Sequence, residues 1–512
     1  MISRDISFEL DWLKKWNQYS PELKAVTNGD TGEYLNYQQF YAKSVLGADF
    51  LNSAFKIKKN SRVLLLSTNE VSSLILFFSL ARLGAALVPI NYRLTVSEIQ
   101  YLIDNSDPEL IIYEPQYFDL LNSVDIKKKK TCPLIGKNSF EDHINIQVES
   151  ENLEKLNSEL GFNSEPESTA LIIYTSGTTG FPKGAMISHR ALFWNSLNTM
   201  MRLNITDQDS AVIFLPLFHT GGWNVLTTPF FHRGAHIILT KKFDADQILK
   251  LSESNKCTLL FGVPTTMAMM SKSPLFKKCD LSKIRYAIVG GEPMPISEIE
   301  LWQTKNIPIR QGYGLTEFGP NVFSLNESDT LRKKGSIGFA NFYIQTQIVN
   351  EANEICKADQ IGELWLKGEM MMTGYWKDDE ATRTTIVDGW LKTGDLVQFD
   401  SEGYFYVVGR KKEMYKSGGE NVYPAEIEKV LMSISAIKEV AVIGVKDELW
   451  GEVGHAYISI NEGMTYNEDE IRQHVFTNLA KFKHPKFYTC LPDLPKGDSG
   501  KILKRQLLNT NQ

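Results

Sequence analysis

The sequence predicts an α/β protein: a large N-terminal domain of parallel strands and helices that includes a β-rich subdomain, followed by a small α+β C-terminal domain. Three observations support this fold class. A chain of 512 residues exceeds the size at which single hydrophobic cores stop growing. Short β-branched runs alternate with helical patterns from about residue 60, and glycine-punctuated strands replace the helices after Gly335.

The alternating segments of the large domain come first. Strands are expected at 62–67, 85–90, 110–113, 211–215, 236–239, 258–262 and 285–289, and helices at 72–83 and 97–105. This alternation is typical of parallel strands joined by crossover helices. Residues 125–166 are rich in Lys, Glu and Asn with weak periodicity, and we interpret them as a surface excursion before the next core strand.

The C-terminal part is predicted from a change of pattern. Strands at 363–366 and 404–408 form the β-rich subdomain that closes the large domain. A basic run that starts at Gly409 marks a boundary, so the expected domains are residues 1–409 and 410–512. In the small domain, helices are expected at 424–434 and 468–479 and strands at 439–445 and 455–460.

Composition excludes several classes of protein. A net charge of −6 and a pI near 5.9 argue against nucleic acid as a partner. Five widely spaced cysteines and an N-terminus without a secretory signal favour a cytoplasmic location. The apolar stretch 72–92 contains Arg82, Gly84 and Pro89, so no transmembrane span is expected. Weak membrane contact and a homodimer stay open.

A run of glycines and hydroxyl residues after the apolar segment 171–174 carries the clearest chemistry. Its members are Thr175, Ser176, Gly177, Thr178, Thr179, Gly180, Phe181, Pro182 and Lys183. Glycines let backbone N–H groups approach a polyphosphate, hydroxyls add donors, and the lysine adds a compact positive charge. The alternative is a flexible surface turn. Lys183 is followed by Gly184, so this is not a Walker A loop, and a phosphoryl-transferring NTPase is disfavoured.

Four further blocks follow in order at 311–317, 390–395, 409–428 and 494–502. With the first run, they resemble the adenylate-forming superfamily, which includes acyl-CoA synthetases, luciferases and peptide-synthetase adenylation domains. The resemblance covers nearly the whole chain and is nearest to acyl-CoA synthetases.

The resemblance implies a role for each block. Nucleotide-binding residues would be Thr175, Ser176, Gly177, Thr178, Thr179, Lys183, Gly312, Tyr313, Gly314, Asp395 and Arg410. Catalytic residues would be Lys501, His219, Thr316 and Glu317, with Glu317 also the Mg²⁺ ligand. Lys412 would be the hinge of a mobile C-terminal domain, and Gly418 and Gly419 would let coenzyme A approach the backbone.

The resemblance also implies an acyl pocket, from two shorter blocks at 216–223 and 290–293. Its expected residues are His219, Trp223, Gly290, Gly291 and Glu292. His219 has the alternative of a core histidine and Trp223 that of ordinary packing. The acidic Glu292 argues against a purely aliphatic pocket. His232 and His236 have a helical metal-site spacing, but 236–239 is expected to be a strand and no third ligand is evident, so no metal is assigned.

The implied activity is an AMP-forming ligase that uses ATP, Mg²⁺ and coenzyme A. It would activate a small-molecule carboxylic acid, fatty or otherwise hydrophobic, as an acyl-adenylate with release of pyrophosphate, and transfer the acyl group to coenzyme A. The alternative within the superfamily is a free-standing enzyme that loads the phosphopantetheine of a carrier protein. A nucleotide-binding protein without catalysis is the third interpretation.

Overall fold

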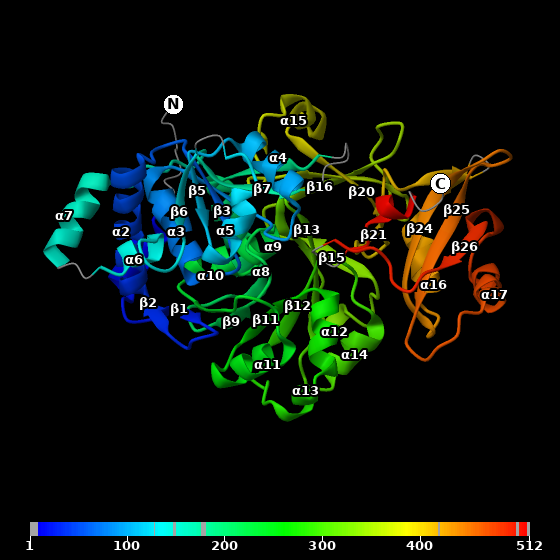
Figure 1. Cartoon of the computed structure of the whole chain (residues 1–512). Coiled ribbons are helices and arrows are strands. Elements are labelled where there is room, and N and C mark those ends of the chain that lie inside the picture. Colours follow the sequence, from blue (N-terminus) through cyan, green and yellow to red (C-terminus); the bar gives the residue numbers. More distant parts are fainter. Residues whose placement is uncertain are drawn as a thin grey trace, which may run out of the picture. The chain divides into compact units, whose positions relative to one another are not determined.

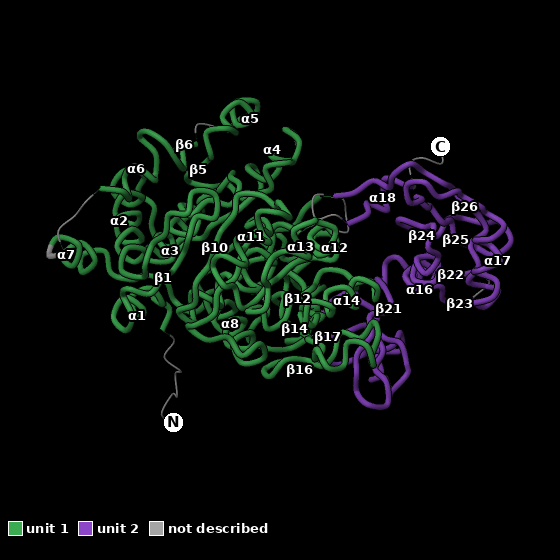
Figure 2. Tube along the Cα trace, turned by 90° about the horizontal axis from the view of Figure 1, so that it is seen from below, with its two compact units in different colours: residues 1–345, 366–391 green, residues 346–365, 392–512 purple. Residues whose placement is uncertain are grey.

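The computed structural model of the chain describes residues 9–126, 129–146, 150–175, 181–417, 420–497 and 501–508. The expected site residues Ser176, Gly177, Thr178, Thr179, Gly418 and Gly419 lie outside the described residues. The chain forms two compact units, residues 1–345 with 366–391 and residues 346–365 with 392–512 (Figure 2). These bounds differ from the expected 1–409 and 410–512. The expected boundary concerns the hinge, which stays a prediction.

The first unit contains a seven-stranded sheet in the order β18-β8-β7-β4-β3-β5-β6. Figure 1 labels β3, β5, β6 and β7 of this sheet. Its strands are β3 (Arg62–Leu66), β4 (Ala86–Ile90), β5 (Leu110–Tyr113), β6 (Lys130–Pro133), β7 (Thr169–Thr175), β8 (Lys183–Ser188) and β18 (Gly374–Tyr375). Strands β7, β4, β3, β5 and β6 run parallel, whereas β8 pairs antiparallel with β7 and β18. The expected strands and parallel pairing are confirmed.

The crossover helices of this sheet also match expectation. They are α3 (Val71–Leu83) and α4 (Val96–Ser106). Every residue of α3 after Val71 is buried, as its mostly apolar sequence predicts. Its C-cap Gly84 has φ +71°, a conformation that favours glycine. A capping box of Thr95 and Glu98 starts α4, whose apolar face packs on β3 to β5.

The interpretation of 125–166 as a surface excursion was wrong in part. β6 lies within it and extends the sheet beside β5. Two short helices, α6 (Phe140–Ile144) and α7 (Ser150–Leu160), follow. Cys132 is the buried residue of β6, and Phe140 is fully buried on α6, so the segment contributes both to the sheet and to the core.

Two further groups of strands complete the sheets of the first unit. A four-stranded sheet has the order β2-β1-β10-β9, and β11 to β15 are hydrogen-bonded in sequence order. Their bounds are β1 (Lys24–Asn28), β2 (Tyr34–Asn36), β9 (Ser210–Ile213), β10 (His236–Leu239), β11 (Leu259–Gly262), β12 (Tyr286–Val289), β13 (Ile309–Leu315), β14 (Gly319–Ser324) and β15 (Ser336–Ala340). Strands β11, β12 and β13 are parallel.

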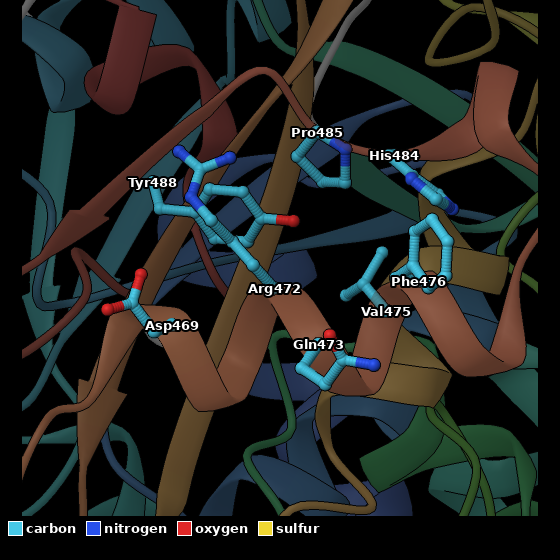
Figure 3. Close-up of a pocket in the computed structure, with 8 residues that line it drawn as sticks. All are labelled: Asp469, Arg472, Gln473, Val475, Phe476, His484, Pro485 and Tyr488. Carbon is cyan, nitrogen blue, oxygen red and sulfur yellow. The ribbon is translucent and has the colours of Figure 1, made fainter.

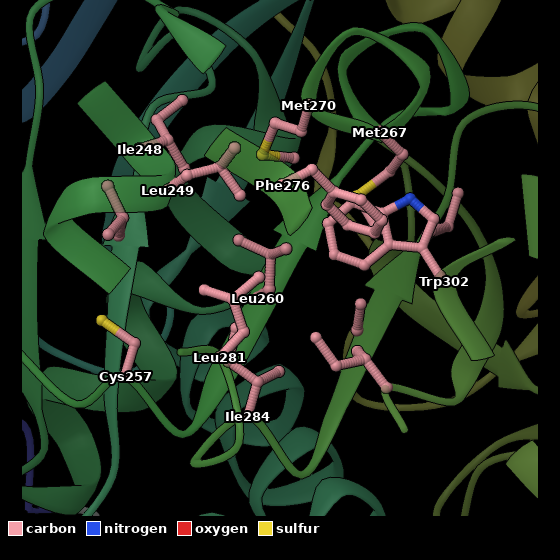
Figure 4. Packing of buried hydrophobic residues seen from close by; sticks show 14 of the residues in the cluster. Ile248, Leu249, Cys257, Leu260, Met267, Met270, Phe276, Leu281, Ile284 and Trp302 are labelled. Atoms are coloured by element: carbon pink, nitrogen blue, oxygen red, sulfur yellow. The ribbon is translucent and has the colours of Figure 1, made fainter. Parts of the chain in front are cut away.

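The remaining helices of the first unit cover these sheets. They are α1 (Trp12–Tyr19), α2 (Tyr37–Phe55), α5 (Phe118–Asn122), α8 (His189–Leu203), α9 (Thr220–Asn224), α10 (Thr227–Arg233), α11 (Ala245–Ser254), α12 (Pro264–Lys272), α13 (Pro274–Lys278), α14 (Ile296–Gln303) and α15 (Asp379–Thr385). A core of aliphatic, Met and aromatic side chains joins β9 to β13 with α11 to α14, and Trp302 packs edge-on against Phe276 in it (Figure 4).

The second unit is rich in strands, as expected. One group has the order β21-β20-β17-β16, and a five-stranded sheet has the order β23-β22-β25-β24 with β26 beside β25. The strands are β16 (Gln345–Val349), β17 (Gly362–Lys367), β20 (Trp390–Phe399), β21 (Phe405–Arg410), β22 (Tyr415–Ser417), β23 (Glu420–Val422), β24 (Ile437–Asp447), β25 (Gly451–Ile460) and β26 (Phe487–Cys490). Short β19 (Ile386–Val387), in the first unit, pairs with the start of β20.

Helices α16 (Pro424–Leu431) and α17 (Glu468–Asn478) pack on the five-stranded sheet through Ile427, Leu431, Ile471 and Val475. A last short helix is α18 (Lys504–Leu508). The α+β pattern predicted for the end of the chain is therefore confirmed. In the described part of the chain, no helix combines the length and the apolar character needed to cross a membrane.

Candidate active site

The β7–β8 hairpin holds both ends of the glycine-rich run. Thr175 ends β7, Lys183 begins β8, and the two residues are cross-strand partners. The Thr175 hydroxyl donates a hydrogen bond of 3.4 Å to the backbone carbonyl of Lys183. The Tyr174 hydroxyl donates to the side-chain oxygen of Asn105 at 2.6 Å, which ties β7 to the end of α4. Both ends of the glycine-rich run are therefore held at the same place, where β7 pairs with β8.

Lys183 faces two groups that the sequence analysis did not select. Its Nζ lies 3.4 Å from a carboxylate oxygen of Asp378 and 5.4 Å from the ring centre of Tyr375. Tyr375 belongs to β18 and pairs with Ala185 of β8, two residues beyond the lysine. An ammonium group in this position is stabilised by the carboxylate and by the ring face.

Glu317 meets the same tyrosine from another part of the chain. The Tyr375 hydroxyl donates to Oε1 of Glu317 at 3.0 Å, and the Met372 N–H donates to the Glu317 carbonyl at 2.9 Å. Burial, with the Glu317 charge as second cause, raises the pKa of Tyr375 well above its ordinary value. Tyr375 thus remains a donor. Thr316 precedes Glu317 in the turn after β13.

The block at 311–317 lies in a tight hairpin between β13 and β14. Tyr313 is the cross-strand partner of Phe323, and their rings meet edge-on at 5.8 Å. The register shifts between Tyr313 and Leu315. A Cβ on Gly314 would lie 2.3 Å from the Pro320 carbonyl carbon, so only glycine fits there. A Cβ on Gly312 would meet its nearest atom at 3.7 Å, which is ordinary contact.

Gly290 and Gly291 follow the carboxyl end of β12. Gly262, Val289 and Gln311 form one register row across β11, β12 and β13, so the residues after them share one sheet edge. A Cβ on Gly290 would lie 3.5 Å from the carbonyl oxygen of Gly312, which brings the expected acyl and nucleotide blocks together. Gly291 has φ +88°. Glu292 is exposed.

His219 and Trp223 lie at opposite ends of α9 and in different surroundings. His219 caps the helix, is half-buried and packs on the ring of Phe218 at 4.6 Å. Trp223 is fully buried, 5.0 Å from the ring centre of Phe77 on α3. Between them, a Cβ on Gly222 would lie 2.2 Å from the Pro216 carbonyl oxygen, so the helix is packed closely against the segment before His219.

Asn69, after β3, fixes that segment. Its side-chain oxygen accepts a hydrogen bond from the Leu217 N–H at 3.0 Å, and its amide donates to the Leu215 carbonyl at 3.1 Å and to the Thr240 carbonyl at 3.3 Å. Asn69 is buried. No local pattern marked this residue, because its partners come from distant parts of the chain.

Asp395 and Arg410, two of the residues expected to bind the nucleotide, lie in the second unit. Asp395 and Arg410 are cross-strand partners on β20 and β21, with Arg410 Nε 2.7 Å from a carboxylate oxygen of Asp395. The Asp395 side chain is 4% exposed and that of Arg410 is 44% exposed, so a ligand would reach the pair from the arginine side. Nearby, Lys411 pairs with Glu363 at 2.9 Å. Partial burial, followed by the charge of Arg410, lowers the pKa of Lys412.

Lys501 is exposed near the end of the second unit. Its carbonyl accepts a hydrogen bond from the Gly497 N–H at 2.8 Å, which closes the loop that carries it. The following helix is anchored by Lys504, which pairs with Glu413 at 2.7 Å and with Glu428 at 2.8 Å. Burial disfavours the Lys504 charge, yet the two carboxylates raise its pKa. The lysine loop is thus tied to the residue after Lys412.

A cavity of about 390 Å³ lies elsewhere in the second unit, between α17 and the start of β26 (Figure 3). Arg472 and Tyr488 line it, with the guanidinium 4.3 Å from the ring centre. Arg472 is already paired with Glu468 at 2.8 Å. None of the expected site residues lines this cavity.

Glu317 fits only one mode of metal binding. Among the residues that the structure describes, no group of three or more His, Cys, Asp or Glu side chains could hold a metal ion. Mg²⁺, however, is commonly bound by one or two carboxylates together with substrate phosphates. A single carboxylate near Lys183, the lysine expected to bind phosphate, suits that mode.

The structure therefore brings several expected residues of the first unit together. Lys183 and Glu317 meet at Tyr375, and Gly290 lies against Gly312. The sequence analysis missed Tyr375, Asp378 and Asn69, none of which lies in a distinctive local pattern.

Comparison with known proteins identifies the family. The AMP-binding enzyme model matches residues 13–376, and the AMP-binding enzyme C-terminal domain model matches residues 426–501. The chain belongs to the AMP-binding enzyme family. It is an adenylate-forming protein close to the acyl-CoA synthetases.

Relatives and solved structures agree over nearly the whole length. A feruloyl-CoA synthase of Amycolatopsis sp. is 32% identical over 496 residues, covering 97% of both chains. A long-chain-fatty-acid–CoA ligase of Mycobacterium tuberculosis is 33% identical over 500 residues, also covering 97% of both. The o-succinylbenzoate CoA synthetase of Bacillus subtilis with its acyl-adenylate intermediate has a TM-score of 0.87, 27% identity and 98% coverage of both chains. With ATP and a magnesium ion, the same synthetase has a TM-score of 0.85 and 27% identity, covering 97% of this chain and 99% of the other.

Proposed function

We propose that the protein is an ATP-dependent, AMP-forming ligase that activates a hydrophobic carboxylic acid and transfers it to coenzyme A. The observation that carries the proposal is the meeting of Lys183 and Glu317 at Tyr375. A lysine for phosphate and a carboxylate for a divalent cation are the two charges that a magnesium–nucleotide needs. The named relatives and the solved synthetase, all acyl-CoA synthetases or ligases, support the same chemistry.

In the first step, a carboxylate oxygen of the acid attacks the α-phosphorus of ATP, and the bond to the pyrophosphate oxygen breaks. Pyrophosphate leaves and the acyl-adenylate remains. Mg²⁺, when bound, would neutralise phosphate charge beside Glu317. The nucleotide would be held by Thr175, Ser176, Gly177, Thr178, Thr179, Lys183, Gly312, Tyr313, Gly314, Thr316, Asp395 and Arg410.

The contact between Lys183 and Asp378 supports the phosphate role. Lys183 already binds an anionic group at 3.4 Å, and the Asp378 side chain is 36% exposed. An exposed ion pair contributes at most about 1 kcal/mol, so a more highly charged polyphosphate can replace the carboxylate at low cost. The ion pair with Asp378 therefore positions the Lys183 ammonium but is weak enough to be replaced by a phosphate.

Lys501 would offset the repulsion between the two anionic substrates. Two unit charges about 4 Å apart interact by about 4 kcal/mol at an effective dielectric of 20, which corresponds to roughly a thousandfold in rate. The thiol of coenzyme A then attacks the acyl carbonyl, AMP leaves, and the thiol proton passes to solvent. We assign Lys412 as the hinge between 1–409 and 410–512, and Gly418 and Gly419 as the backbone beside the pantetheine arm.

The acyl group would lie beside His219, Trp223, Gly290, Gly291 and Glu292. Apolar neighbours support a hydrophobic acid: a Cβ on Gly221 would lie 3.8 Å from the ring of Phe261, and a Cβ on Gly291 would lie 3.7 Å from the Val263 side chain. The exposed carboxylate of Glu292 supports a polar group at the pocket mouth.

Pyrophosphate exchange tests the first step. The purified chain is incubated with ATP, Mg²⁺, labelled pyrophosphate and a panel of aromatic, fatty and short acids, and label entering ATP is measured. We expect exchange that requires an acid. Release of ADP and phosphate, or no acid-dependent exchange, would contradict the proposal. For the second step, mass spectrometry after addition of coenzyme A or a phosphopantetheinylated carrier protein shows which thioester forms.

A further inference from the structure

The segment 372–376 contacts both charged groups of the proposed nucleotide site. It binds Glu317 twice, through the Met372 N–H and the Tyr375 hydroxyl. The ring of Tyr375 also lies 5.4 Å from the Lys183 ammonium. One side chain therefore touches the expected metal carboxylate with its hydroxyl and the expected phosphate lysine with its ring.

Tyr375 is itself held firmly. It pairs with Ala185 in β8, and the next residue, Trp376, donates its N–H to the Gly184 carbonyl at 2.7 Å. The Tyr375 N–H donates to the Thr382 hydroxyl at 2.8 Å. Tyr375 is 9% exposed, so its ring has little freedom to change rotamer. A group held this way can transmit its position to the side chains that it contacts.

We propose that Tyr375 is a positioning residue for the magnesium–nucleotide, which fixes the Glu317 carboxylate in the orientation that receives the cation and sets Lys183 beside it. The inference rests on the proposed function. Tyr375 occupies one acceptor position on Oε1 of Glu317, and the other carboxylate oxygen is left for a metal or its water. Without this hydroxyl, the carboxylate turns freely and metal binding must first order it.

The hydrogen bond from the Tyr375 hydroxyl to Oε1 of Glu317 supports this role. As a neutral donor, the hydroxyl leaves the Glu317 charge in place for a cation. A purely structural tyrosine would instead contribute to stability alone, and its hydroxyl would not alter metal affinity.

The test compares Tyr375→Phe with Tyr466→Phe. Tyr466 of the second unit donates to a Glu468 carboxylate oxygen at 3.1 Å, so the control removes the same kind of bond outside the proposed site. Binding of Mn²⁺ with α,β-methylene-ATP is measured by electron paramagnetic resonance, and thermal unfolding reports the fold of each variant. We expect Tyr375→Phe to weaken metal binding about tenfold and Tyr466→Phe to leave it unchanged.

Two further variants test the inference by binding affinity, so that a loss of stability alone cannot account for the result. In a Glu317→Gln background, Tyr375→Phe should add no further loss of metal affinity, since the carboxylate that the hydroxyl orients is no longer there. Asp378→Asn should raise affinity for metal-free nucleotide two- to fivefold, roughly the strength of an exposed ion pair. Unchanged metal affinity in a folded Tyr375→Phe, or full additivity with Glu317→Gln, overturns the inference. Failure of the wild type to bind metal and nucleotide overturns the proposed function and the inference with it.

Discussion

His189 should make the stability of the first unit depend on pH. It begins α8 directly after β8, is 6% exposed, and has Nε2 3.0 Å from the Ser164 hydroxyl oxygen. The Ser164 hydroxyl donates its hydrogen to the Ala81 carbonyl at 2.6 Å, so it accepts from His189, whose neutral tautomer carries the proton on Nε2. Burial lowers the pKa of His189 to about 4.

The magnitude follows from that pKa. The unfolded histidine has a pKa of about 6.5, so the unfolded chain binds more protons between about pH 6.5 and pH 4. The stabilisation from a buried neutral histidine is fully present above pH 6.5 and is lost as the pH falls toward 4. At 1.36 kcal/mol per pKa unit, the total approaches about 3 kcal/mol, of which about 2 kcal/mol is lost between pH 7.5 and pH 5.

The assay is urea unfolding of the full chain at about pH 7.5 and pH 5, for the wild type and for His189→Gln. Glutamine keeps a donor for Ser164 but cannot titrate. We expect the loss on acidification to be about 2 kcal/mol smaller in the variant, while His232 and His236, whose pKa values burial also lowers to about 4, keep the remaining dependence in both proteins. Equal losses in the two proteins would refute the reasoning.

Three further predictions concern the site. Lys501→Ala should lower acid-dependent pyrophosphate exchange roughly thousandfold, while thioester formation from supplied acyl-adenylate changes only a few-fold; equal loss of both steps would contradict alternation of the C-terminal domain. Gly314→Ala should lower the melting temperature by several degrees, because its Cβ must displace the Pro320 backbone, whereas Gly312→Ala, with its nearest contact at 3.7 Å, should have little effect. Gly290→Val should raise the KM for bulky acids at least tenfold and leave that for ATP nearly unchanged; an equal change in both constants would separate Gly290 from acyl selection.

Much of the fold could be predicted because buried parallel strands have a strong sequence pattern. The runs that became β3, β4 and β5 are continuously apolar, since both faces of these strands are covered. β6 was missed because it has Cys132 alone as a buried residue and polar neighbours before it. An edge strand needs only one covered side, so its sequence resembles a loop.

The residues of the candidate site also fall into two groups, those that could be predicted from the sequence and those that could not. Lys183 could be selected because it ends a short run of glycine and hydroxyl residues with its own chemistry, and Glu317 because its block resembles one of the adenylate-forming superfamily. Tyr375 could not, because its importance comes from partners on β8 and in the turn after β13, which the sheets bring near it. No sequence pattern within a few residues of Tyr375 or Asp378 indicates those contacts.

The edge formed by β11, β12 and β13 shows how the information in a short sequence motif differs from the information in strand pairing. Gly262 and Val289 end β11 and β12, Gln311 lies beside Val289 in β13, and ligands of open α/β sheets usually bind beyond such carboxyl ends. Gly290 and Gly312 are two of the three positions that follow this row, and a Cβ on Gly290 would lie 3.5 Å from the Gly312 carbonyl oxygen. The glycines were visible in the sequence, but it is strand pairing that brings their two separate short motifs side by side.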